Sequence, residues 1–212
     1  MRAGLRQAFD ASILYESALV IEPILDWEQR YRDATTAWER GELNPAFQAL
    51  RPTFSENPGT VIIPGCGRAP EVLAFAQLGW HVIGIDVAET AVMYQRECLA
   101  SAGLTGDIEQ GNLFDWLPST PVDLIYEQTC LCALDPKQWP PYERVLREWL
   151  RSGGTLAALF MQKEGEGGPP FHCDIESMRG LFASTHWDWG QQAFRAVHPV
   201  GVCELTYLLT RR

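Results

Sequence analysis

From residue 59 onward, short apolar runs alternate with segments whose apolar residues have helical spacing. The apolar runs predict five strands, at 60–64, 81–86, 107–110, 122–127 and 155–160. The segments between them predict helices at 70–78, 89–102 and 137–150. Because strand and helix alternate throughout, the pattern predicts an α/β fold with a mostly parallel sheet and helices on both faces.

The alternation changes after the fifth strand. A helix at 175–182 is followed by two β-like segments, at 187–196 and 202–209, with His198, Pro199 and Gly201 between them. Segments this close in sequence pair as an antiparallel hairpin, since parallel neighbours need a longer crossover. The sheet therefore differs from the six parallel strands of a dehydrogenase.

Residues 1–58 have no strand pattern and are predicted to be helical and irregular, with a helix near 45–50. A segment that precedes such a sheet can cover the carboxyl ends of the strands, where open α/β sheets bind ligands. The chain has 212 residues, a length typical of one domain. We therefore expect one domain, with residues 1–58 as an N-terminal lid segment and 59–212 as a Rossmann-like core.

The charge balance restricts the class of partner. With 17 Lys and Arg against 27 Asp and Glu, the formal net charge is −10, which opposes binding to nucleic acid or to an anionic membrane. A small molecule is the expected partner, and the sequence leaves the oligomeric state open.

The cysteines and the N-terminus indicate the compartment. Six cysteines occur without a C-x-x-C pair, so neither a disulfide framework nor a zinc site is predicted. Asp10, Glu16 and Glu22 interrupt the apolar positions near the N-terminus before a signal-peptide core can form. No apolar run reaches the length of a membrane span. These features predict a cytoplasmic protein with reduced thiols and no metal.

A glycine pair follows the first predicted strand. Gly65 and Gly67 allow the backbone to approach a ligand, and the next helix presents free N–H groups. Asp86 ends the second strand 21 residues after Gly65, close to the spacing at which a carboxylate reaches a ribose diol. Where a dinucleotide loop has its third glycine, this chain has Pro70. The loop therefore favours an adenosyl ligand without a pyrophosphate, such as S-adenosylmethionine.

Several stretches, in order, resemble the thiopurine S-methyltransferase family and its plant halide and thiol methyltransferase relatives, within the class I methyltransferases. They cover about residues 27–180 and read WEQRYRDATTAWERGELNPAF, IIPGCGRAPEVLAFAQLG, VIGIDVAETAV, DLIYEQTCLCAL, WPPYE, SGGTL and GGPPFHCDIE. The resemblance implies a seven-stranded Rossmann-like class I fold and S-adenosyl-L-methionine as cofactor.

The resemblance also implies roles for nine residues. Three aromatic residues would surround the cofactor, two glycines would meet its methionine end, one carboxylate its ribose, two residues its adenine and one amide its sulfonium region. In that order, these residues are Trp27, Tyr31, Trp38, Gly65, Gly67, Asp86, Asn112, Leu113 and Gln128.

This chain departs from the family pattern at four positions. Tyr31 replaces a usual tryptophan and Ala69 a usual glycine. Asn112 replaces an aspartate that accepts a hydrogen bond from the adenine amine, and its side-chain oxygen can still accept one. Gln128 stands where the plant enzymes have an aromatic residue, which leaves the acceptor open.

The chemistry expected of such an enzyme needs no strong base. A thiol with a pKa near 8.5 supplies some thiolate at neutral pH, so alignment and exclusion of water suffice. No catalytic side chain is assigned, and Phe171, His172 and Cys130 are the candidates for the acceptor pocket. We expect methyl transfer to a small thiol. Three alternatives stay open: a halide or thiocyanate methyltransferase, a nicotinamide-dependent oxidoreductase and a non-catalytic protein that binds the adenosyl ligand.

Overall fold

The computed structural model describes residues 26–198 and 201–212. The acidic residues that argue against a signal peptide, together with Pro199, lie outside these ranges. Within them, none of the helices has the length and apolar character needed to cross a membrane.

Seven strands form one sheet, in the spatial order β3-β2-β1-β4-β5-β7-β6. The strands β1 to β5 pair in parallel, whereas β7 is antiparallel to both β5 and β6. The predicted α/β class, the seven-stranded sheet and its C-terminal hairpin are therefore confirmed. Their bounds are β1 Thr60–Pro64, β2 His81–Asp86, β3 Asp107–Gln110, β4 Val122–Gln128, β5 Leu150–Gln162, β6 Trp187–Val197 and β7 Cys203–Arg211.

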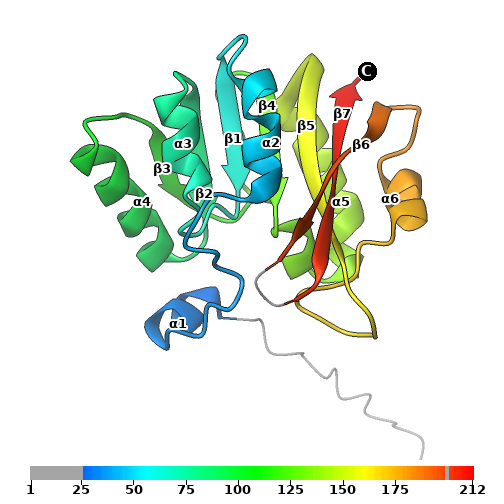
Figure 1. The fold of residues 1–212 in the computed structure, drawn as a ribbon, viewed down its shortest axis with the longest axis horizontal. Coiled ribbons are helices and arrows are strands. Elements are labelled where there is room, and N and C mark those ends of the chain that lie inside the picture. The colour runs from blue at the N-terminus through cyan, green and yellow to red at the C-terminus, as the bar shows by residue number, and fades with distance from the viewer. Residues whose placement is uncertain (1–25, 199–200) are drawn as a thin grey trace, which may run out of the picture.

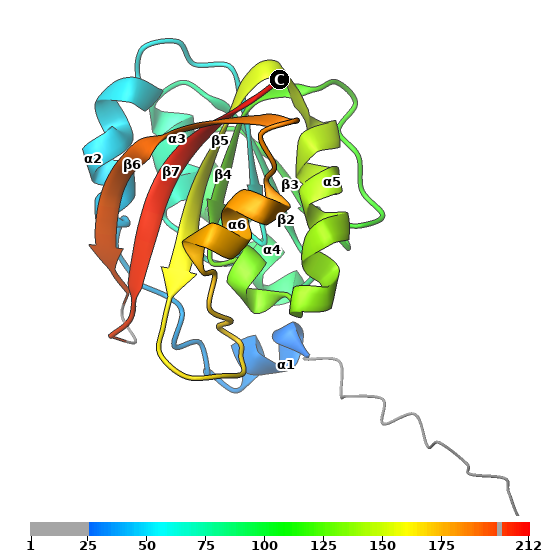
Figure 2. The ribbon, with the colours of Figure 1, turned by 90° about the vertical axis from the view of Figure 1, so that its right-hand side faces the viewer.

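Helices cover both faces of the sheet (Figures 1 and 2), as the alternating pattern predicts. Apolar side chains of α2, α3 and α4 pack on one face, and those of α5 and α6 on the other. The short helix α1 lies beyond the end of the sheet toward which β5 points (Figure 2). The helices are α1 Trp27–Arg32, α2 Pro45–Phe54, α3 Glu71–Gln77, α4 Glu89–Ser101, α5 Trp139–Trp149 and α6 Ile175–Leu181, with 3-10 turns η1 Leu131–Ala133 and η2 Pro136–Gln138.

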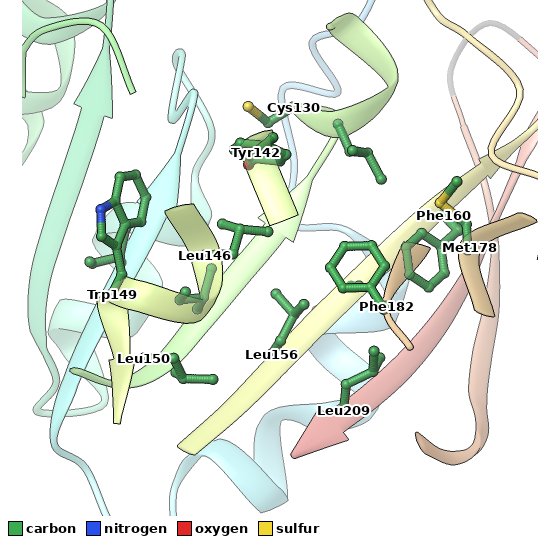
Figure 3. Packing of buried hydrophobic residues seen from close by; sticks show 14 of the residues in the cluster. Cys130, Tyr142, Leu146, Trp149, Leu150, Leu156, Phe160, Met178, Phe182 and Leu209 are labelled. Carbon is green, nitrogen blue, oxygen red and sulfur yellow. The ribbon is translucent and has the colours of Figure 1, made fainter. Parts of the chain in front are cut away.

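The core has one apolar layer on each face of the sheet. On one face, Leu146 of α5, Leu156 of β5 and Phe182, which follows α6, pack in the same apolar cluster (Figure 3). On the other face, Phe75 of α3 and Tyr126 of β4 pack with their ring centroids 5.5 Å apart.

Strand β5 is longer than the sequence pattern predicts. It begins at Leu150, which pairs with Val122 of β4, and the register then shifts before Leu124 pairs with Thr155. Gly153 lies in this shift with φ of 74°, a backbone conformation that glycine adopts readily and that is common at β-bulges. Gly153 therefore lies at an irregularity within β5 and does not mark where the strand begins.

Candidate functional site

The glycine loop lies at the carboxyl end of β1, between β2 and β4. In an open α/β sheet this is the point where the strand order reverses and ligands bind. Gly65 and Gly67 have φ of 55° and 48°, a left-handed conformation that costs other residues about 1–2 kcal/mol. A side chain at Gly67 would also meet the Tyr31 hydroxyl, since a Cβ there would lie 2.7 Å from it. Both glycines are therefore needed for the shape of the loop.

Asp86 connects the end of β2 to this loop. One carboxylate oxygen accepts the Gly67 N–H at 2.8 Å, and the other accepts the Ala88 N–H at 2.8 Å. Burial of the side chain raises the pKa of Asp86, and these hydrogen bonds partly oppose the rise. Each carboxylate oxygen has a second lone-pair site, so Asp86 can still accept a hydrogen bond from a hydroxyl group.

Gln95 of α4 holds the other side of the loop. Its amide nitrogen donates to the carbonyl oxygens of Gly67 and Ala69, each at 2.9 Å, and the side chain is buried. The sequence analysis missed this residue, because one glutamine in a helical pattern carries no signal that it contacts a loop 26 to 28 residues earlier.

Residues 27–44, which we call the cover segment, place three aromatic rings beside the loop. The ring centroid of Trp38 lies 5.4 Å from that of Trp27 and 5.7 Å from that of Tyr31, both in edge-to-face geometry. The rings pack against Ala88 and Ala91, just beyond β2. Burial raises the pKa of Tyr31, and the nearby Asp86 carboxylate raises it further, so the hydroxyl stays protonated.

Ion pairs attach the cover segment to the core. Glu39 accepts two hydrogen bonds from the Arg68 guanidinium, both at 2.6 Å. Arg40 donates to Glu204 of β7 at 2.7 Å, and this pair is almost completely buried. Such fork-like and buried contacts attach the cover segment to the loop and to β7.

Two buried carboxylates receive the end of the cover segment. The backbone N–H of Asn44 donates to Glu71 at 2.6 Å, and its side-chain amide donates to Glu204 at 2.9 Å. Burial raises the pKa values of both Glu71 and Glu204. Sequence reasoning missed both carboxylates along with Arg40 and Asn44, because their partners are distant in sequence.

A cavity of about 40 Å³ lies between the loop, the end of β4 and the cover segment. Four of the predicted site residues line it, and it has room for water only. Its lining is formed by Trp38, Glu39, Arg40, Ile63, Gly65, Cys66, Gly67, Arg68, Ala69, Pro70, Glu71, Tyr126, Gln128 and Thr129. The predicted residues are Trp38, the two glycines and, as a fourth from β4, Gln128.

A larger, open groove of about 770 Å³ lies between α1 and α4. It is lined by Met93, Tyr94 and charged residues, and none of the predicted site residues lines it. We therefore assign the candidate site to the smaller cavity, where the loop and the strand ends meet.

Asn112 and Leu113 follow β3, and a backbone hydrogen bond of the preceding residue links this segment to Asp86. The N–H of Gly111 donates to the carbonyl of Asp86 at 2.9 Å. The side-chain oxygen of Asn112 accepts the N–H of Phe114 at 3.1 Å, while Leu113 is buried. The backbone contact places the predicted adenine position next to the predicted ribose position.

The three residues predicted for the acceptor pocket are not among those that line the cavity. Cys130 packs behind the loop, where its sulfur would lie 3.0 Å from a Cβ at Gly65, and it contacts Tyr142 (Figure 3). Burial raises the pKa of this thiol, which makes it a poor nucleophile. The Phe171 N–H donates to the backbone carbonyl of Cys132. The Nδ1 of exposed His172 accepts the backbone N–H of Lys163 at 3.1 Å.

The residues present fit S-adenosylmethionine by their chemistry. The loop glycines leave backbone accessible, Asp86 retains lone pairs for a hydroxyl, and Trp38 offers an aromatic face. Because 40 Å³ is far below the roughly 300 Å³ of a small-molecule pocket, side chains that line the cavity would have to rearrange for a nucleoside to bind.

Comparisons with known proteins show which family the chain belongs to. The family model for thiopurine S-methyltransferase matches residues 24–197. A probable thiol methyltransferase 2 from Arabidopsis thaliana is 31% identical over 153 residues, covering 70% of this chain and 67% of the relative. Thiocyanate methyltransferase 1 from the same plant is 29% identical over 154 residues, covering 71% and 68%.

A solved structure shows the same fold. The 1,6-didemethyltoxoflavin-N1-methyltransferase of Burkholderia thailandensis, crystallised with S-adenosylhomocysteine, has a TM-score of 0.64 and 15% sequence identity, covering 91% of this chain and 93% of that chain. The expected Rossmann-like class I fold is thereby confirmed. The chain belongs to the thiopurine S-methyltransferase family and is a methyltransferase that depends on S-adenosylmethionine.

Proposed function

We propose that the protein transfers a methyl group to the sulfur of a small thiol or related soft anion. The end of β4 carries this proposal. In place of the Asn/Asp-Pro-Pro-Tyr loop of amide and amine methyltransferases, it has Gln128 and Thr129. The neighbouring Glu127 is buried, accepts the N–H of Leu131 at 2.6 Å and does not line the cavity, so it is not placed to act as a base on an acceptor there. A thiolate does not need one.

The names of two relatives, a thiol and a thiocyanate methyltransferase, support the same acceptor class. The thiocyanate relative also favours the second candidate, a halide or thiocyanate methyltransferase. Both candidates use a soft anion in the same cavity and differ only in the size of the acceptor.

The bound cofactor would supply an electrophilic methyl group on a sulfonium. In this proposal Gly65 and Gly67 hold its methionine end, Asp86 its ribose, and Asn112 with Leu113 its adenine. The aromatic rings of the cover segment, Trp27, Tyr31 and Trp38, close over it, and Gln128 lies beside the sulfonium. These groups align the reactants and exclude water, which is the main requirement for an in-line transfer to a good nucleophile.

Phe171, His172 and Cys130 stay candidates for the acceptor side. Phe171 would wall the pocket with its ring, and Cys130 supports the loop from behind. His172 is exposed, and its substitution by alanine would test whether it faces an acceptor.

The proposal is tested by incubating the purified protein with S-adenosylmethionine and a panel of thiols, thiocyanate, bisulfide and iodide. We expect an S-methyl product from at least one sulfur acceptor, identified by mass spectrometry. Methyl iodide or methyl thiocyanate alone would favour the second candidate. Binding of the cofactor without any of these products would refute the proposal and leave a non-catalytic protein. Calorimetric titration distinguishes a nicotinamide-dependent oxidoreductase, which should bind NADH, from a methyltransferase, which should bind S-adenosylhomocysteine.

We further propose a cytoplasmic location and a small molecule, not nucleic acid, as the partner. Six free cysteines are compatible with a reducing compartment, and the net charge of −10 opposes nucleic-acid binding.

A further inference from the structure

Tyr126 and Gln128 form a hydrogen-bonded pair at the end of β4. The Tyr126 hydroxyl donates to the side-chain oxygen of Gln128 at 2.9 Å. The Tyr126 ring is fully buried against Phe47, Phe54 and Phe75, with centroids 5.5 to 6.1 Å away. A ring held on three sides gives its hydroxyl a fixed position, so the amide that receives the hydrogen bond is also fixed.

The direction of this hydrogen bond determines the orientation of the amide. Burial raises the pKa of Tyr126 well above its ordinary value, and the carboxylates of Glu71 and Glu204 raise it further, so the hydroxyl keeps its proton. One oxygen of each carboxylate is buried without a hydrogen-bond partner among the described residues, so neither takes that proton. The proton is therefore donated to the oxygen of Gln128, which leaves the NH2 group on the other side.

The NH2 group of Gln128 has no partner among the hydrogen bonds of the described residues, although Gln128 lines the cavity. Among the other cavity donors, Arg40 binds the Val197 carbonyl and the Glu204 carboxylate through its two Nη atoms, and Arg68 binds Glu39, whereas the Nε of Arg40 is buried without a partner among the described residues. Thr129, with φ of 60°, turns the chain sharply after Gln128, and its hydroxyl donates to the Gln128 carbonyl at 2.7 Å. Gln128 thus offers uncharged side-chain N–H groups at the end of β4 that no other described residue accepts.

We propose that Gln128 donates a hydrogen bond to the anionic methyl acceptor and that Tyr126 is the positioning residue that aims it. The inference rests on the proposed function, because it concerns the acceptor of that same site. An anion that enters a small buried cavity loses its water and needs a donor in return. The Glu71 carboxylate in the same lining opposes an anion, and the Arg40 and Arg68 guanidinium groups are paired with carboxylates, so a neutral, correctly directed donor supplies attraction that these ions do not. The pair therefore selects acceptors such as thiolate or thiocyanate that accept N–H hydrogen bonds.

The test compares Gln128→Leu and Tyr126→Phe with the wild type, using thiocyanate and a small thiol as acceptors. Gln128→Leu removes both N–H groups at similar volume, and we expect KM for thiocyanate to rise about tenfold or more, with a smaller change in kcat. Tyr126→Phe keeps the ring but frees the amide, so a smaller rise in KM is expected. Gln192→Leu, at an exposed position of β6, is the matched control and should change neither constant.

Calorimetric binding of thiocyanate to the protein saturated with S-adenosylhomocysteine keeps the inference separate from the proposed function. Weaker thiocyanate binding in Gln128→Leu supports the inference, even if the wild type forms no S-methyl product. Equal KM and equal binding in that variant, or no thiocyanate binding to the wild type, would overturn it. A loss of S-adenosylhomocysteine affinity alone would show that Gln128 serves the cofactor only and would also overturn it.

Discussion

Glu127 predicts a specific dependence of stability on pH. Its side chain is buried at the end of β4, and its carboxylate accepts the Leu131 N–H that begins the turn η1. Burial is the main cause that raises its pKa from 4.5 to about 7, while hydrogen bonds from the backbone of Leu131 and Cys130 oppose the rise. The folded protein therefore holds a proton on Glu127 at pH values where the unfolded chain has lost it.

The sign and size of the effect follow from linkage. Because the pKa of Glu127 is higher in the folded state, its contribution to stability is complete below about pH 4.5 and is lost as the pH rises through 7. The loss amounts to about 3 kcal/mol in the free energy of unfolding. Glu127→Gln keeps an oxygen for the Leu131 N–H but cannot ionise, so this variant should not lose that stability.

Urea unfolding followed by tryptophan fluorescence at pH values from 5 to 8.5 measures this difference. We expect the free energy of unfolding of the variant, minus that of the wild type, to increase as the pH rises, mostly between pH 5 and 7.5. Glu97→Gln, at an exposed position of α4, is the control and should run parallel to the wild type. Parallel curves for Glu127→Gln would show that the carboxyl titrates normally, and the reasoning from burial would be wrong.

Three further predictions concern the loop and the cover segment. Gly67→Ala should lower the affinity for S-adenosylhomocysteine in a calorimetric titration, because the left-handed φ costs about 1–2 kcal/mol and the new Cβ would meet the Tyr31 hydroxyl; unchanged affinity would contradict it. Arg40→Met should lower the free energy of unfolding by about 3–5 kcal/mol, because Glu204 would stay buried without its cation; adding Glu204→Met should recover much of the loss, and additive losses in urea unfolding would count against the pair. Gln95→Leu should lower the free energy of unfolding by about 1–3 kcal/mol and weaken S-adenosylhomocysteine binding, because two loop carbonyls lose their donor. Thermal unfolding and calorimetric titration with S-adenosylhomocysteine check the two effects.

Local patterns made the strands and helices predictable. Strand β2 was predicted with its observed bounds, His81–Asp86, because a short apolar run lies between turn residues. The loop was predictable for the same reason, since Gly65, Gly67 and Asp86 are recognised by their spacing along the chain. Strand β5 was predicted too short, because its first residues pair through a register shift that no periodicity reveals.

The attachments of the cover segment could not be predicted from the sequence. Arg40 and Glu204 are 164 residues apart, and each alone resembles a surface charge. Glu71 lies in the first turn of α3, where an acidic residue is expected to be solvated, yet it is buried and binds the backbone of Asn44. Pairs of buried charges depend on which segments meet in space, and hydrophobic spacing does not report that.

The buried carboxylates at this edge of the sheet bear on why the loop departs from the dinucleotide pattern. Glu71, Asp86, Glu127 and Glu204 are all buried there, and burial raises the pKa of each. Each accepts hydrogen bonds from a segment that shapes the site, so the cost of burying it is offset by the order it imposes. Those carboxylates that ionise oppose a pyrophosphate at this edge, and Arg40 and Arg68 offset part of their charge. Pro70, at the N-cap of α3, replaces the third glycine at a loop that has no pyrophosphate to seat. The carboxylates and the loop sequence thus disfavour a pyrophosphate for different physical reasons.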